Sequence, residues 1–219
     1  LKQELNLSIT YGPGMVYMSD NPFQTWPDFR KLGVQDLAML GTLFDFGFDF
    51  RGANFSCDCE MEPFLEVAEE VIRKVWVDYF DVKCASPPDL EGELIIDLVK
   101  KKRLDMFVCT RDADEGCPVN CKCVEQPSKS RFLVDCQGKG LIELPKSLPN
   151  TSFAYELNVC NNEISVLESR NYFGNIAVLK ASNNSLQKVD AEAIKRLLNA
   201  RNLSLANNTD LIYYFPKTT

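Results

Sequence analysis

Nine cysteines are the residues of this sequence whose type and spacing could support chemistry. Eight of them fall between residues 57 and 136, where the closest ones form the strings C-x-C and C-x3-C-x-C, and the ninth stands apart. Their positions are Cys57, Cys59, Cys84, Cys109, Cys117, Cys121, Cys123, Cys136 and Cys160. Clustered cysteines can bind zinc, exchange thiols and disulfides, or form structural disulfides. The surrounding sequence has to discriminate among these three.

Acceptor sites for N-linked glycans accompany the cysteines. Six Asn-x-Ser/Thr sites occur, at Asn6, Asn54, Asn150, Asn183, Asn202 and Asn207. Six in a chain of 219 residues indicate the secretory route, where disulfides are the default state of clustered cysteines. Zinc would need C-x-x-C-like knuckles or histidine, a redox motif would need C-x-x-C, and the sequence contains none of these. We therefore predict disulfides, N-linked glycans, and no metal or other cofactor.

Spacing alone leaves the pairing of eight cysteines open. One local constraint applies, because residues two apart in an extended chain point to opposite sides. Cys57 and Cys59 should therefore bond to different partners.

Composition argues against catalysis and nucleic-acid binding. Histidine is absent, which excludes Ser-His-Asp and Cys-His arrangements. Paired carboxylates could serve a glycosidase, but 31 acidic residues spread along the chain are better explained by solubility. The net charge of −7 disfavours phosphate backbones as partners. The one basic run, residues 100–103, is interpreted as a solvated surface, with a glycan or partner contact as the alternative. We predict no catalytic residues, no enzyme activity and no nucleic-acid partner.

The elements that position the cysteines are repeats. After the cysteine region, "AYELNVCNNEI", "IAVLKASNNSL" and "ARNLSLANNTDL" share the pattern L-x-L-x-x-N-x-L, with the last leucine one place late in the third. The asparagines Asn162, Asn184 and Asn208 fall 22 and 24 residues apart, inside the leucine-rich repeat range. Each L-x-L should form a short parallel strand with its apolar side chains facing inward. Each asparagine should bond the backbone of the neighbouring turn.

A weaker form of the pattern occupies the first 55 residues. Met18 and Asn21 fit one repeat, and Phe48 and Phe50 fit another in which Ala53 replaces the asparagine. The gap of 32 residues between Asn21 and Ala53 is too long for one plain repeat and predicts an insertion or an irregular convex side. A solenoid also exposes apolar side chains at its two ends, and terminal units must cover them.

The cysteine strings resemble the two caps of extracellular leucine-rich repeat proteins. "NFSCDCEMEPFLEVAEEVIRKV…KCASPPDLEG…FVC" is similar to the C-terminal cap, although Asn54 and Ala53 replace the family's proline and asparagine, and Pro88 comes one place late. "CPVNCKC…VDCQGKGLIELPKSLP" is similar to the N-terminal cap and its lead into the first repeat. The resemblance implies four disulfides: Cys57–Cys84, Cys59–Cys109, Cys117–Cys123 and Cys121–Cys136.

A helix within the first cap is expected independently of the resemblance. Pro63 suits the first helical position. The apolar face that follows consists of Phe64, Val67, Ala68, Val71, Ile72 and Val75. We expect this face to cover the last coil of the first block rather than to bind a partner.

The order of the modules implies an α/β fold of two leucine-rich repeat solenoid blocks. Residues 1–55 would end the first block, 56–110 form its C-terminal cysteine-rich cap, 111–150 form an N-terminal cysteine-rich cap, and 151–219 begin the second block. This layout resembles the juxtamembrane ectodomain of multiple-cysteine-cluster Toll receptors. Slit-type guidance proteins use the same alternation.

The Toll resemblance implies a non-enzymatic ectodomain of a signalling receptor on the extracellular side of the plasma membrane. Such a receptor binds a protein ligand, often a dimeric cystine-knot cytokine, and forms a homodimer on activation in innate immunity or development. No apolar run approaches the roughly 20 residues that cross a bilayer, and no signal peptide opens the chain. We expect a piece of a longer protein that meets the membrane only through a segment absent from this chain. The alternative is a secreted or adhesive Slit-type module that binds a receptor and heparan sulfate, which strong basic patches would favour.

Three further expectations concern single sites. Asn6 and Asn202 should point outward from the concave sheet, where glycans would bar a flat ligand, so we hypothesise that binding or pairing uses a lateral face or the cap junction. Cys160 is interpreted as a free, half-buried thiol, with a link to another chain or to a partner cysteine outside this sequence as the alternatives. The polar segment 109–117 should pack little and set the angle between the blocks.

Overall fold

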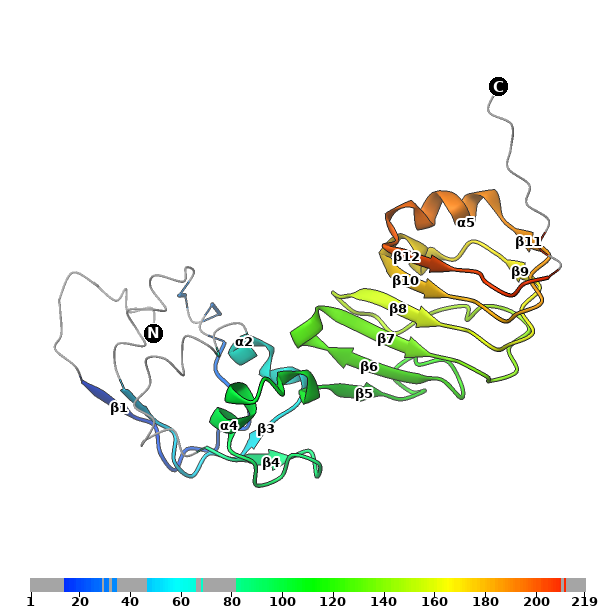
Figure 1. The fold of residues 1–219 in the computed structure, drawn as a ribbon. Helices are drawn as coiled ribbons and strands as arrows, with labels where there is room; N and C mark the ends of the chain where they lie inside the picture. The colour runs from blue at the N-terminus through cyan, green and yellow to red at the C-terminus, as the bar shows by residue number, and fades with distance from the viewer. Residues whose placement is uncertain are drawn as a thin grey trace. The chain divides into compact units, whose positions relative to one another are not determined.

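The computed structural model describes residues 14–28, 30–31, 33–34, 47–65, 68, 82–209 and 211. The chain divides into two compact units, Leu1–Phe107 and Val108–Thr219 (Figure 1). Each unit has its own cluster of buried apolar side chains. The fold is mixed α/β with parallel strands in both units.

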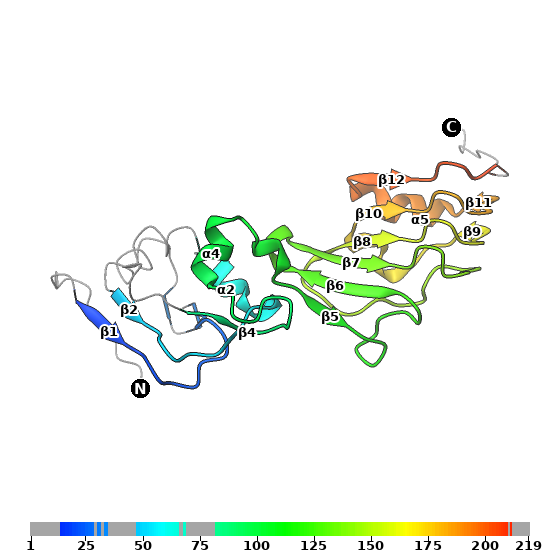
Figure 2. The same cartoon turned by 60° about the horizontal axis from the view of Figure 1, so that its bottom comes forward.

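The second unit is organised around one sheet of six strands in the order β12-β10-β8-β7-β6-β5 (Figure 2). The strands are β5 (Cys109–Arg111), β6 (Lys122–Gln126), β7 (Arg131–Asp135), β8 (Ala154–Asn158), β10 (Ile176–Lys180) and β12 (Asn202–Ser204). Pairing is antiparallel from β5 to β7 and parallel from β7 to β12. Strand β7 therefore joins the cysteine-rich hairpin to the repeats.

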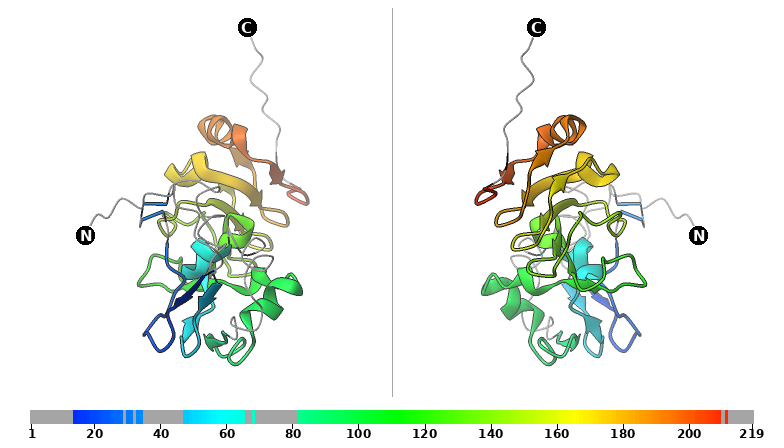
Figure 3. Two further views of the ribbon diagram at one scale, coloured as in Figure 1. Left: turned by 90° about the vertical axis from the view of Figure 1, so that its left-hand side faces the viewer. Right: turned by 90° about the vertical axis from the view of Figure 1, so that its right-hand side faces the viewer.

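The remaining elements of this unit follow the sheet strands in sequence. They are η4 (Pro127–Lys129), β9 (Val166–Leu167), η5 (Asn171–Asn175), β11 (Lys188–Val189), α5 (Ala191–Arg196) and η6 (Leu197–Asn199). Strands β9 and β11 pair in parallel, and the Asp190 side chain caps α5 by accepting from the Glu192 backbone N–H. In the end-on views of Figure 3, α5 and β12 lie on opposite sides of the coils. Each repeat is thus one turn of chain with a sheet strand on one side.

Alternate residues of the sheet strands face the core, as the repeat pattern predicts. The register aligns Val134, Leu157 and Leu179, all buried, and places Leu203 next in the same row. Leu203 in β12 is 39% exposed. The L-x-L pattern therefore supplies the apolar row of the second unit.

Three asparagines hold the turns that follow the strands. Asn184 is buried; its Nδ2 donates to the carbonyls of Val159, Ala181 and Ser182, and its Oδ1 accepts from the Ile164 N–H at 3.0 Å. Asn162 and Asn208 occupy the same position in the neighbouring coils and make the corresponding bonds. The prediction that these asparagines bond the turn backbone is confirmed.

We predict that Asn184→Ala destabilises the second unit by about 2–3 kcal/mol, because the buried Ile164 N–H loses its acceptor. Hydrogen exchange of the β8 and β10 amides against added urea measures this loss. Asn199→Ala, at an exposed position of η6, is the control and should stay within about 0.5 kcal/mol of the wild type. Equal losses in the two variants would show that the buried amide has no special role.

The first unit contains shorter elements around an aromatic core. They are β1 (Met15–Tyr17), β2 (Gly47–Asp49), β3 (Phe55–Ser56), η1 (Cys59–Met61), α2 (Glu62–Leu65), β4 (Cys84–Ser86), α4 (Ile95–Lys100) and η3 (Leu104–Met106). Strands β1 and β2 pair in parallel, as do β3 and β4. The ring of Trp26 lies 5.2 Å from that of Phe50 and 5.1 Å from that of Phe64, between centroids. These rings pack together with aliphatic side chains such as Leu90, Ile95 and Leu98 in the buried cluster of this unit.

The predicted cap helix is described only in part. Pro63 is the second residue of α2 rather than the first, and both Phe64 and Ala68 are buried. The other residues of the predicted apolar face, Val67, Val71, Ile72 and Val75, lie outside the described residues. The two described residues of the predicted apolar face, Phe64 and Ala68, therefore point into the core as predicted.

The weaker repeat of this unit forms a turn that differs from the later ones. Asn21 donates to the carbonyls of Met18 and Ser19, as the later asparagines do within their own turns, but its side chain is exposed. Ala53, at the asparagine position of the next repeat, is buried. The inward asparagine is therefore not a feature of the described turns of this unit.

A buried carboxylate stands at the end of β2. Asp49 is fully buried and accepts two bonds from the Arg51 guanidinium, Nε to Oδ1 at 2.9 Å and Nη2 to Oδ2 at 2.7 Å. These bonds to Arg51 hold the pKa of Asp49 below its usual value, although burial opposes them. A depressed folded-state pKa contributes stability above the unfolded pKa of about 4, and this contribution is lost as the pH falls through the folded value.

We predict that Asp49→Asn costs the first unit about 1–2 kcal/mol at pH 7, because a charge-assisted pair becomes a neutral contact. The difference from wild type should shrink as the pH falls below about 4, where the wild-type carboxylate also becomes protonated. Both tryptophans of the chain, at positions 26 and 76, belong to this unit, so tryptophan fluorescence during urea unfolding reports on it. A difference that stays constant from pH 7 to pH 3 would contradict the assigned role.

Candidate functional site

The cysteine clusters form disulfides in both units. Bonds join Cys57 to Cys84, Cys117 to Cys123 and Cys121 to Cys136, with Cα–Cα distances of 5.5, 5.8 and 4.4 Å. These are pairs that the cap resemblance implies. Cys59 and Cys109 are also disulfide-bonded, and their pairing with each other stays a prediction. Within the described part of the chain, no group of three histidine, cysteine, aspartate or glutamate side chains could hold a metal ion.

The disulfides of the second unit secure its hairpin to the core. Cys123 lies in β6 opposite Val134 of β7, and Cys117, Cys123 and Cys136 belong to the same buried cluster as the first leucines of the repeats. Each bridge contributes about 2–4 kcal/mol to the stability of the folded unit. The disulfide-bonded hairpin and the parallel strands therefore share one core.

The other side of the six-stranded sheet is a surface that we call the open face. Its residues lie in two rows that run across the strands at the alternate positions of the register. One row consists of Thr110, Val124, Leu133, Glu156, Val178 and Asn202, and the other of Lys122, Asp135, Asn158, Lys180 and Ser204. All of these side chains are exposed or half-buried. The open face thus mixes a few apolar side chains with charges of both signs.

Polar groups on the open face are largely bonded to one another. Arg131 donates to the Gln126 Oε1 and to the Glu156 Oε2, each at 2.7 Å. Asn158 donates to both Asp135 and Gln137 at 3.0 Å. A further bond of 2.7 Å joins the hydroxyls of Ser182 and Ser204. These bonds hold Arg131, Glu156, Asp135 and Asn158 in place, and a molecule that contacts this surface would have to replace them or leave them intact.

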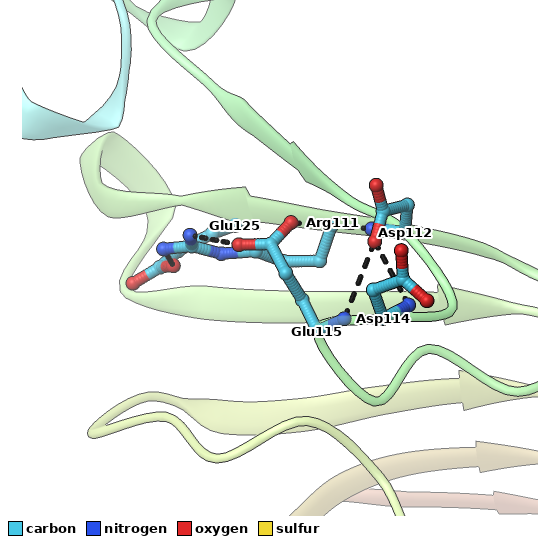
Figure 4. Close-up of polar contacts among 5 residues, drawn as sticks. All are labelled: Arg111, Asp112, Asp114, Glu115 and Glu125. Atoms are coloured by element: carbon cyan, nitrogen blue, oxygen red, sulfur yellow. Dashed lines mark hydrogen bonds and ion pairs between the residues drawn. The ribbon is translucent and has the colours of Figure 1, made fainter.

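A compact ionic cluster holds the first strand of this unit (Figure 4). Arg111 in β5 donates from Nη2 to Glu125 at 2.7 Å and from Nη1 to Glu115 at 2.8 Å. The bond to Glu125, followed by that to Glu115, raises the pKa of Arg111. The Asp112 carboxylate accepts from the N–H groups of Asp114 and Glu115 and so fixes the following turn.

This cluster corrects the expectation for the first three residues of segment 109–117 only. The segment was expected to pack little, yet its first three residues form β5, which pairs with β6. The reason is that Arg111 supplies the counter-charge for the acidic side chains around it. Thr110 and residues 112–116 are nevertheless exposed, so these residues pack little, as expected.

We predict that Arg111→Ala lowers the stability of the second unit by about 1 kcal/mol, since Glu125 and Glu115 lose their shared cation. The loss should decrease in about 1 M salt, where the Debye length falls to about 3 Å. Thermal unfolding at low and high salt measures both effects. Arg196→Ala, which removes an exposed pair with Glu192, is the control and should change little. A salt-independent loss would indicate packing rather than charge.

The predicted glycan acceptors lie at exposed positions wherever the structure describes them. These positions are Asn54, Asn150, Asn183, Asn202 and Asn207, and Asn6 lies outside the described residues. Asn202 is paired with Val178 in the register and so belongs to the open face, on the outward side as expected. The attachment of glycans remains a prediction.

Cys160 is free and half-buried. Its backbone N–H donates to the Asn158 Oδ1 and its carbonyl accepts from the Gly138 N–H. Among the described residues, no general base or cation is bonded to the thiol of Cys160. We therefore assign no reaction to this thiol.

Sequence reasoning missed the arginines that organise the second unit. Arg111 and Arg131 reach carboxylates 14 and 25 residues away, and no local pattern indicates such pairs. The doublet Asn-Asn was a usable signal, because it recurs in every coil of this unit.

The fold, in which parallel strands continue through one sheet into a disulfide-bonded hairpin, is similar to that of part of the Drosophila Toll ectodomain. A solved Toll–Spätzle complex in its glycosylated form matches 89% of this chain and 23% of that chain, with a TM-score of 0.56 and 20% identity. A second structure of the complex matches 71% of this chain and 21% of that chain, with a TM-score of 0.53 and 20% identity. At this identity the likeness establishes the fold alone.

Curated relatives are more similar in sequence over shorter stretches. Protein halfway of Drosophila pseudoobscura pseudoobscura is 31% identical over 131 residues, which are 52% of this chain and 21% of that protein. Protein halfway of Drosophila melanogaster is 31% identical over 112 residues, 43% of this chain and 18% of that protein. The chain thus spans about a fifth of the length of these relatives. No protein-family model matches it.

Among the described residues, no helix has both the length and the apolar character required to cross a membrane.

Proposed function

We propose that this chain is part of the ectodomain of a Toll-type single-pass signalling receptor. It comprises the end of one leucine-rich repeat solenoid block (1–55), a C-terminal cap (56–110), an N-terminal cap (111–150) and the start of a second block (151–219). The main support is the six-stranded sheet, in which a disulfide-bonded hairpin continues into regularly spaced parallel coils. The Toll fold match over 89% of the chain supports the same assignment.

The proposed activity is non-enzymatic binding of a protein ligand, with pairing of receptor chains on activation, in innate immunity or development. The solved neighbour is Toll in complex with Spätzle. By analogy, the proposed ligand class is a dimeric cystine-knot cytokine. The disulfides and acceptor asparagines favour a location on the extracellular side of the plasma membrane.

The proposed contact is a lateral face rather than the open face. A glycan on Asn202 would project from the open face next to Val178 and would obstruct a flat ligand there. The bonding of Arg131, Glu156 and Asn158 to their neighbours adds a cost, since a ligand would have to replace these contacts.

A second candidate is a secreted Slit-type module that binds a receptor and heparan sulfate. One observation favours it: Lys100, Lys101 and Lys102 are all exposed at the end of α4. Their neighbour Arg103 is half-buried, and its Nη1 lies 3.9 Å from the Glu93 Oε1. The three lysines offer positive charge to a sulfated polysaccharide in a chain whose net charge is −7.

Two measurements separate the candidates. Sequencing the native transcript beyond Thr219 should reveal a second C-terminal cap, about 20 apolar residues and a TIR-like domain. On immobilised heparin, the secreted native ectodomain should elute below physiological ionic strength, and K100E/K101E/K102E should elute at the same position. Retention above that ionic strength that is lost in the triple variant, or further capped blocks without a membrane span, would favour the Slit-type module.

A further inference from the structure

A second row of asparagines runs alongside the buried one. Asn161, Asn183 and Asn207 each precede one of the turn-bonding asparagines, of which Asn162 and Asn184 are buried and Asn208 is half-buried. All three have left-handed backbones, with φ of 58°, 54° and 57°. Their side chains are exposed. The Asn183 Nδ2 donates to the Asn161 Oδ1, and the Asn207 Nδ2 donates to the Asn183 Oδ1, both at 2.8 Å. We call this chain of amides the outer ladder.

Two of the three members are glycan acceptors. Ser185 completes the acceptor site of Asn183, and Thr209 completes that of Asn207. Asn161 is not an acceptor, because Glu163 occupies the required position. The outer ladder therefore brings two acceptor amides into direct contact on neighbouring coils.

The direction of the bonds decides which hydrogen each amide uses. Asn183 accepts from the following coil through Oδ1 and donates to the preceding coil through Nδ2. Its C=O and the donated N–H thus point in opposite directions, so the ladder uses the hydrogen anti to the carbonyl oxygen. A trans N-glycosyl amide carries its sugar syn to the oxygen and retains the anti hydrogen. Glycosylation and the ladder are therefore compatible at Asn183.

We propose that the outer ladder holds two N-linked glycans, on Asn183 and Asn207, side by side and in a fixed orientation. Attachment forms the bond between Nδ2 and sugar C1 of a lipid-linked oligosaccharide. The lipid diphosphate leaves C1, and Nδ2 loses its syn hydrogen as a proton. Neighbouring strands of a sheet lie about 4.8 Å apart, so the two glycans crowd each other from their first sugar onward.

Crowding has a measurable consequence, because trimming enzymes must enclose the branches of a glycan. Two glycans held on adjacent coils shield each other and remain in the oligomannose form. Asn150 and Asn202 are internal references. Asn202 lies on the open face, and neither amide belongs to the outer ladder. Their glycans should be trimmed and extended normally.

Site-resolved glycopeptide mass spectrometry of the secreted native protein tests this inference. We expect Asn183 and Asn207 to be occupied on the same molecule and sensitive to endoglycosidase H, whereas Asn150 and Asn202 are resistant. Thr209→Ala removes the acceptor site at Asn207 but keeps its amide in the ladder, and should make the Asn183 glycan resistant. Ser185→Ala is the reciprocal variant and should make the Asn207 glycan resistant.

Asn161→Gly tests the ladder apart from the crowding. It keeps the left-handed backbone and both acceptor sites, and removes only the amide that accepts from Asn183. We expect partial processing at Asn183 and little change at Asn207. Wild-type processing at Asn183 and Asn207 equal to that at Asn150 and Asn202, or occupancy of only one of the pair per molecule, would overturn the inference.

The inference rests on the secretory location in the proposed function, and the two can fail separately. Absence of glycans from every acceptor would refute the secretory location and the inference together. Glycans at Asn150 and Asn202 with no protection at Asn183 and Asn207 would refute the inference alone.

Discussion

Parallel coils face one constraint that governs the second unit: every turn places backbone groups inside the molecule, away from water. A buried amide is suited to this position because it offers two donors and an acceptor within one short side chain. Asn184 contacts its own turn and the backbone of the preceding coil. The buried asparagines therefore fix the spacing of the coils as well as their turns. The leucines of β8, β10 and β12 align in the strand register that this spacing allows.

The disulfide-bonded β6–β7 hairpin solves the complementary problem at the start of the coils. An exposed first strand would leave both unpaired backbone groups and uncovered leucines. Strand β7 provides both remedies, since it pairs antiparallel with β6 and parallel with β8 while Val134 continues the apolar row. The disulfides and the Arg111 cluster hold the hairpin that presents it. The hairpin is thus a part of the six-stranded sheet.

The sequence predicted those features that depend on local periodicity. The spacing of Asn162, Asn184 and Asn208 was sufficient to place the strands and the buried amides, because each repeat meets the same environment. The strand β5 and the ion pairs of Arg111 and Arg131 could not be predicted, since they depend on partners brought together by the fold. Asn21 differs for a related reason. The repeat pattern predicts that an asparagine bonds the turn at this position, but it does not predict whether other parts of the fold bury that asparagine.

The joining of cap and coils in one sheet also bears on how the second unit folds. The β6–β7 hairpin involves only local contacts and is closed by short disulfide loops, so it can form early. Once formed, it offers β8 a ready edge, and β8 then offers one to β10. Each step closes a loop of similar length, so the strands can dock one after another in one direction along the chain. That direction is also the direction of synthesis, which allows a coil to dock as it emerges from the ribosome.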